Sequence, residues 1–166
     1  LRAGKDPLLI LKPLAARAGS SDQATADEAK YLIERIHKWA QDQVDIAKAL
    51  AHNEPERCRE KIETLARQFK GTELESIVAA AQDALKNDQQ YQSALDAIAT
   101  LDKIKELEKK LKPNRRQDRF EAMNAPILKE MKTLIEKLQK QDEKSKITAE
   151  AVQIGLKYKI IKKEKD

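Results

Sequence analysis

A sharp corner between two amphipathic helices constrains the fold of this chain more than any other feature of the sequence. On both sides of Gly71, apolar residues recur at steps of three and four, the spacing of one helix face. Glycine readily adopts the left-handed backbone that ends a helix, and Thr72 with Glu75 has the spacing of a capping box that starts the next one. We therefore predict a helical hairpin with its apolar faces turned inward. The recurring residues are Cys58, Ile62, Leu65 and Phe69 before the corner, and Leu74, Ile77, Val78, Ala81 and Leu85 after it.

The composition favours helices in the rest of the chain as well. Of the 166 residues, 37% are charged and only 4% are aromatic, a balance that suits long solvated helices and is poor in sheet-forming residues. No apolar run approaches the roughly 20 residues that span a bilayer, and a single cysteine excludes an internal disulfide. We expect an all-α fold with more than roughly 70% helix.

Apolar periodicity and cap signals predict six or seven antiparallel amphipathic helices, arranged as a helical-hairpin array or as a bundle. Pro126 lies inside the sixth helix and predicts a kink near Asn124. The expected segments are a short helix from Pro7 to Gly19, then 22–52, 55–69, 73–87, 89–112 and 115–140, and a last helix capped by Thr148.

These helices are expected to form a single helical domain over 1–158, with 1–87 and 88–158 as possible sub-units. We interpret residues 159–166 as a basic, frayed tail. Because the sequence begins with Leu1, we expect that the chain was processed or cut from a longer protein.

Positive charge is concentrated in the second half of the chain. Residues 1–102 carry a net charge of −3 and residues 103–166 a net charge of +8. The densest cluster surrounds a helix–helix corner at Pro113, where arginine forks can hold phosphates; the other interpretation is a solvated corner, since Glu alternates with Lys through most of the region. No aromatic residue is interleaved, so recognition of single-stranded nucleic acid is not supported. The cluster consists of Lys109, Lys110, Lys112, Arg115, Arg116 and Arg119.

Few residues have the spacing of a chemical site. Basic neighbours can lower the pKa of Cys58, but Cys58 occupies the apolar stripe and is expected to be buried and inert. His37 and His52 are isolated, no cluster has zinc spacing, and the four glycines form no phosphate loop. We therefore expect no catalytic, cofactor-binding or metal-binding residues and no enzyme activity. A role of Cys58 in an enzyme or a redox accessory is a less favoured hypothesis than the two binding functions described at the end of this section.

The segment Ile62–Leu74 resembles the turn of tetratricopeptide-type helices in bacterial envelope proteins. In those proteins an aromatic residue ends a helix, Pro-Gly-Ser/Thr forms the turn, and an alanine-rich helix follows. Here Phe69 and Gly71-Thr72 hold the first two places and Ala79–Ala81 the third, while Lys70 departs from the usual proline. The roughly 34-residue period of true tetratricopeptide arrays is absent from the sequence.

The region 22–112 also resembles the helical tails that follow thioredoxin-fold domains in some bacterial proteins. No Cys-x-x-Cys is present, so this resemblance implies no redox activity. Together, the resemblances imply a scaffold for protein–protein interaction, as an accessory or C-terminal domain of a larger bacterial protein. They favour an exported or periplasmic location over a cytoplasmic one.

Two functions therefore compete on the sequence alone. Stacked helix pairs leave grooves suited to a partner protein, and Tyr31 and Trp39 are candidate anchors if they do not belong to the core. The alternative is a helical domain that binds nucleic acid or an acidic surface through the cluster in 109–119. We favour the protein partner, because the N-terminal half is net negative.

Overall fold

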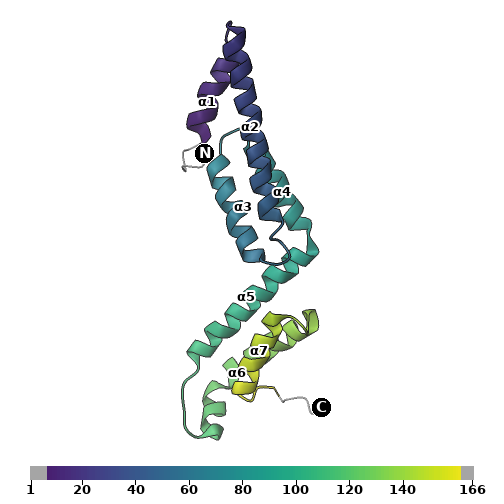
Figure 1. The fold of residues 1–166 in the computed structure, drawn as a ribbon. Coiled ribbons are helices and arrows are strands. Elements are labelled where there is room, and N and C mark those ends of the chain that lie inside the picture. The colour runs from purple at the N-terminus through teal and green to yellow at the C-terminus, as the bar shows by residue number, and fades with distance from the viewer. Residues whose placement is uncertain (1–6, 162–166) are drawn as a thin grey trace. The chain divides into compact units, whose positions relative to one another are not determined.

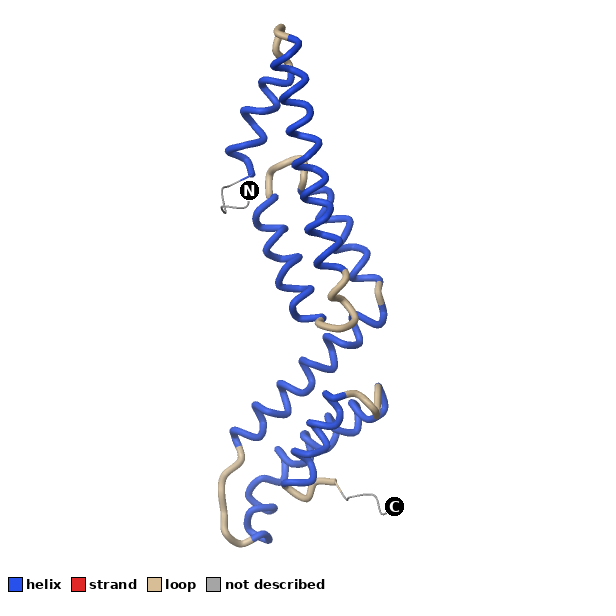
Figure 2. The backbone as a smooth tube through the Cα atoms, viewed as in Figure 1, coloured by secondary structure: helices blue, strands red, loops and turns tan. Residues whose placement is uncertain are grey.

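The computed structural model of the chain describes residues 7–161, and in this range it shows seven helices and no strand (Figures 1 and 2). It is 80% helical, so the predicted all-α fold is confirmed. The chain divides into two compact units, 1–92 and 93–166, and the division lies a few residues after the possible one at residue 87. The helices are α1 (Pro7–Ala18), α2 (Gln23–Lys48), α3 (Pro55–Phe69), α4 (Glu75–Asn87), α5 (Gln89–Lys110), α6 (Gln117–Gln141) and α7 (Lys146–Lys157).

In the first unit, α1, α3 and α4 all pack against α2. The buried side of α2 consists largely of alanine, which lets neighbouring helices approach closely, and larger side chains come from α3 and α4. Every apolar residue of the predicted hairpin is buried except Ile77, which is half-buried. The buried residues of α2 are Ala26, Ala29, Ala40, Val44 and Ala47.

The corner between α3 and α4 has the predicted left-handed glycine, with Gly71 at φ 76°. The predicted capping box is wrong in detail. The Thr72 hydroxyl accepts from the backbone N–H of Leu74 at 3.2 Å and donates to the Phe69 carbonyl at 2.7 Å. The Glu75 carboxylate accepts from the backbone N–H of Gly71 at 2.8 Å instead of from Thr72. The two side chains therefore hold the turn itself, and Leu74 is the N-cap of α4.

Two other helix starts show how small polar residues set the boundaries. Asp22 is the N-cap of α2, and its carboxylate accepts from the backbone N–H of Thr25. The predicted Thr148 cap of α7 is wrong, because Ser145 holds that position and accepts from the backbone N–H of Thr148 at 3.0 Å. Thr148 is buried, and its hydroxyl donates to the Leu138 carbonyl at 3.3 Å.

The second unit has its own apolar core, formed by α5, α6 and α7. α6 continues through Pro126 from Gln117 to Gln141. Ile160 and Ile161 pack against this core, after a turn in which Lys159 has φ 56° and the Ile160 N–H donates to the Gly155 carbonyl at 2.9 Å. Ile160 and Ile161 of the expected tail are thus packed, while Lys159 is exposed and 162–166 lie outside the described residues. The buried members of the core are Leu101, Ile104, Leu107, Met131, Ile135, Leu138 and Ala151.

Candidate functional site

A row of apolar side chains on α2 stays partly exposed after the first unit has folded. Leu32, Trp39 and Ile46 are seven residues apart, so they recur every two turns along one side of the helix. Leu32 is 39% exposed and Ile46 is 51% exposed, while Trp39 is half-buried. The buried residues, such as Ala40 and Val44, lie about a quarter turn or more around the helix from this row. We call Leu32, Trp39 and Ile46 the α2 row.

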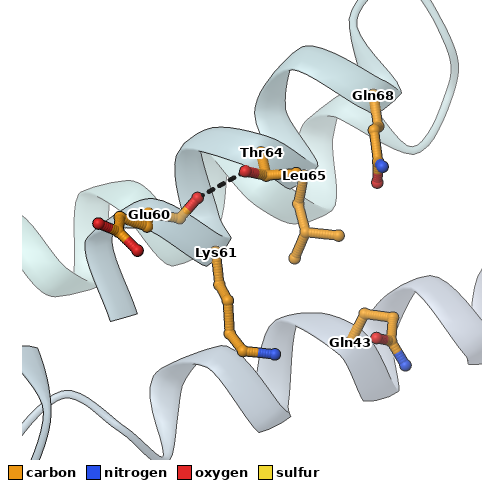
Figure 3. Close-up of a pocket in the computed structure, with 6 residues that line it drawn as sticks. All are labelled: Gln43, Glu60, Lys61, Thr64, Leu65 and Gln68. Atoms are coloured by element: carbon orange, nitrogen blue, oxygen red, sulfur yellow. Dashed lines mark hydrogen bonds between the residues drawn. The ribbon is translucent and has the colours of Figure 1, made fainter. Parts of the chain in front are cut away.

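A groove of about 310 Å³ lies between α2 and α3. Gln43 lines it and is one helical turn from both Trp39 and Ile46, so the groove adjoins the α2 row. Figure 3 shows Lys61 and Leu65 of α3 pointing toward the helix that carries Gln43. Most side chains that line the groove are therefore polar, and Leu65 is the one apolar side chain among them. Its lining residues are Gln43, Glu60, Lys61, Thr64, Leu65 and Gln68.

The two aromatic residues predicted as anchors have different environments. The Trp39 ring meets the Phe69 ring edge-on, with centroids 5.9 Å apart and an interplanar angle of 65°. Tyr31 is 57% exposed, and the Arg35 guanidinium lies 5.8 Å from its ring centroid. Trp39 is thus held at the edge of the core, and Tyr31 lies on the surface.

The predicted basic cluster surrounds the connection between α5 and α6, which is drawn as a loop in Figure 2. Arg116 pairs with Asp118 through two contacts, at 2.9 Å and 3.3 Å, and this pairing lowers the pKa of the Asp118 carboxyl. Within residues 7–161, the other five cations have no carboxylate within 4.0 Å. All six side chains are exposed: Lys109, Lys110, Lys112, Arg115, Arg116 and Arg119.

One buried side chain holds this loop in place. Asn124 of α6 is 1% exposed, and its carbonyl oxygen accepts from the backbone N–H of Lys112 at 2.9 Å. Its amide group donates to the backbone carbonyls of Lys112 at 3.0 Å and Phe120 at 2.9 Å. The backbone of Lys112 is therefore fixed on α6 while its side chain stays exposed.

Cys58 is fully buried, as the sequence predicts. Burial raises the pKa of the Cys58 thiol, although a hydrogen bond with the Tyr91 side chain acts in the opposite direction. Burial, together with the neighbouring Cys58, raises the pKa of Tyr91 to about 12. A thiol in this environment is disfavoured as a thiolate nucleophile.

The two histidines each lie beside one carboxylate. His37 Nε2 lies 2.9 Å from Glu73 Oε1, and His52 Nε2 lies 3.6 Å from Asp88 Oδ2. Both contacts join α2 or the turn after it to residues that flank α4. Within the described range, no group of three or more histidine, cysteine or acidic side chains is placed to hold a metal ion.

Three residues of these sites, Leu32, Ile46 and Asn124, are missing from the sequence-based candidates, although Asn124 and Ile46 each left a signal. Asn124 is a polar residue on the predicted apolar face of α6, between Phe120 and Met131, where the helical spacing predicts a buried side chain. Ile46 is an isoleucine outside the buried stripe of α2, seven residues after Trp39.

The fold and these sites define an all-α protein of two helical units, with an apolar row on one unit and a basic loop on the other. None of the helices in 7–161 has both the length and the apolar character that a membrane crossing requires. No family model, curated protein or solved structure matches the chain, so the tetratricopeptide-like resemblance stays a prediction.

Proposed function

We propose that this chain is a non-enzymatic helical scaffold that binds an amphipathic helix of a protein partner along the α2 row. The proposal rests on the two-turn repeat of Leu32, Trp39 and Ile46 on a partly exposed side of α2. A single exposed apolar residue needs no explanation, but apolar residues at seven-residue intervals form the seam through which one helix packs on another.

The dimensions and the charges of the α2 row suit a short helix. Each seven-residue step advances about 10.5 Å, so the row extends about 21 Å, or about four helical turns. Exposed charges also repeat at seven residues on its outer flank, at Glu28, Arg35 and Asp42. Because flanking charges select the partner of a helical seam, we expect a partner helix with a basic–acidic–basic pattern.

Two features of the first unit support a scaffold in preference to an enzyme. The only cysteine of the chain is buried, and its raised pKa disfavours the thiolate. Trp39 is held by Phe69, so it presents its exposed edge to a partner at a low entropy cost.

The proposal is tested by site-specific photo-crosslinking in the cells that produce the protein. A photoreactive group at Asp42, beside the α2 row, should give one discrete adduct, and the same group at Lys137 should not. The crosslinked peptide, identified by mass spectrometry, should be helical, with apolar residues at seven-residue intervals. The double variant Leu32→Ser, Ile46→Ser should lose the adduct and keep its circular dichroism spectrum, because both side chains are exposed.

Adducts with many unrelated proteins, or an adduct that survives the double variant, would contradict this function. An adduct between two copies of this chain would also contradict it, since the α2 row would then serve self-association.

A further inference from the structure

The basic loop carries a charge that the rest of the second unit does not neutralise. Residues 109–119 contain six cations and one carboxylate, a net charge of +5 that equals the net charge of the whole chain. Elsewhere in this unit, Lys103 pairs with Glu130 at 2.7 Å, Lys105 with Glu150 at 2.8 Å and Lys157 with Glu108 at 2.7 Å. The cations of residues 109–119 therefore form the densest group of cations in the described part of this unit, and five of the six have no carboxylate within 4.0 Å.

The loop presents its cations from a fixed backbone. Asn124 holds both the N–H and the carbonyl of Lys112, and the Asn114 side chain accepts from the backbone N–H of Arg116 at 3.0 Å. Leu111, the first residue after α5, packs against the apolar core. A fixed backbone keeps the charges close together, so less conformational entropy is lost when an anionic surface binds.

Apolar surface is exposed among these cations. Met123 is 51% exposed, and its sulfur lies 3.6 Å from the amide nitrogen of Asn114 in the loop. Pro113, at the centre of the loop, is exposed as well. Cations around exposed apolar groups match an anionic lipid surface, where apolar chains lie just below the charged headgroups.

The aromatic and amide side chains near the loop, which could stack on bases or hydrogen-bond with them, are already occupied. Phe120 is buried and stacks on Tyr158, with ring centroids 6.0 Å apart, so it offers no stacking surface. The Gln117 amide donates to Glu121 at 2.7 Å, and the Asn114 side chain is engaged within the loop. These contacts favour lipid over nucleic acid as the anionic partner.

We propose that the loop between α5 and α6 is a peripheral docking site for membranes that contain anionic lipids. Lys109, Lys110, Lys112, Arg115 and Arg119 would contact the headgroups, and Met123 would enter the interface beside them. The site is independent of the α2 row, because it lies in the other unit.

The test is co-sedimentation of the full chain with phosphatidylcholine vesicles that contain or lack phosphatidylglycerol. Binding should require phosphatidylglycerol and should weaken as salt is raised, because screening reduces attraction to the surface. Each lysine near an anionic surface contributes about fivefold to partitioning, so Lys109→Gln, Lys110→Gln, Lys112→Gln should weaken binding by about 100-fold. Met123→Ser should weaken it by about fivefold, since part of an apolar side chain is lost.

A matched control removes the same number of lysines from exposed positions of the same unit: Lys129→Gln, Lys137→Gln, Lys140→Gln. We expect this variant to lose less than tenfold. Equal losses in the two triple variants would overturn the proposal, because binding would then follow net charge and not the loop. Absence of binding to phosphatidylglycerol vesicles would overturn it as well, as would tighter binding to duplex DNA than to those vesicles at the same ionic strength.

Discussion

Gly71 sets the path of the chain between α3 and α4. Its φ of 76° lies in the left-handed region, which costs residues with a side chain about 1–2 kcal/mol. The surrounding hydrogen bonds from Thr72 and Glu75 depend on this backbone, because Glu75 accepts from the N–H of Gly71 itself. The direction in which α4 returns on α3 is thus fixed by the Gly71 backbone and by the side chains of Thr72 and Glu75.

Replacing this glycine should therefore destabilise the first unit. We expect Gly71→Val to lower the free energy of unfolding by about 1–2 kcal/mol or more, as measured by urea denaturation. Gly19→Ala is the control, because a methyl group there meets only the Ala16 carbonyl oxygen, at an ordinary 3.7 Å. Equal effects of the two substitutions would show that the left-handed backbone is not what Gly71 supplies.

The buried pair of Cys58 and Tyr91 makes the free energy of unfolding depend on pH in the alkaline range. Both pKa values are raised in the fold, that of Tyr91 to about 12. An acid with a raised pKa stabilises the fold at pH values below its unfolded pKa, and this contribution is lost as pH rises through the folded pKa. For Tyr91 the window runs from its ordinary pKa of about 10 to about 12.

The wild-type chain should lose about 2–3 kcal/mol more stability across this window than Tyr91→Phe, as measured by urea denaturation at several pH values. Tyr31→Phe, at an exposed position, should follow the wild-type curve. Parallel curves for the wild type and Tyr91→Phe would contradict the assignment of the buried phenol.

At the scale of the element, α2 has two apolar stripes with different uses. One is buried and consists largely of alanine, and the other is the α2 row. Sequence periodicity does not separate the two stripes, because it cannot tell a wide buried face from a narrow one with an exposed edge. The difference depends on where α1, α3 and α4 lie, and that arrangement is set by tertiary packing.

This division of α2 makes a prediction about two isoleucines. Ile46→Ala should cost less than about 1 kcal/mol, because the side chain is 51% exposed. Ile62→Ala should cost about 2–5 kcal/mol, because Ile62 is 4% exposed and its loss leaves a cavity. Urea denaturation of both variants measures this, and a large cost at Ile46 would place that residue in the folding core and not on a binding surface.

Helix positions were easier to predict than helix caps. The range of α3 matches its prediction, since Pro55 and Gly71 punctuate the chain at its two ends. The sequence misplaces the cap of α7, because Ser145 and Thr148 are both good capping residues and only the burial of Thr148 against α6 decides between them. The six members of the basic cluster are a prediction from sequence, and the structure shows that their side chains are exposed. The anchoring role of Asn124 cannot be predicted from sequence, because its backbone partner, Lys112, is 12 residues away.

At the scale of the whole molecule, two apolar cores form within one chain. The core of 93–166 contains residues of α5, α6 and α7, while that of the first unit is built around α2. The sequence shows both sets of apolar residues but not their separation, because α5 carries one continuous apolar pattern across the boundary.

The two methionines of the chain test whether these cores unfold separately. Met131 is fully buried in the second core, so Met131→Ala should destabilise that unit by about 2–5 kcal/mol. Circular dichroism should show an earlier loss of helix, while the fluorescence of Trp39 in the first unit keeps its midpoint. Met123→Ala, at an exposed position, is the control. A matching shift in both signals would mean that the two cores unfold as one.

The central claim, that the α2 row binds a partner helix, can be measured directly through Trp39, the only tryptophan of the chain. Once crosslinking has identified the partner segment, acrylamide quenching of Trp39 is measured as that peptide is added. We predict that quenching falls at saturation, because the partner covers the exposed edge of the ring, and that Leu32→Ser, Ile46→Ser weakens this titration by at least about tenfold. Binding that leaves the quenching of Trp39 unchanged would contradict the account.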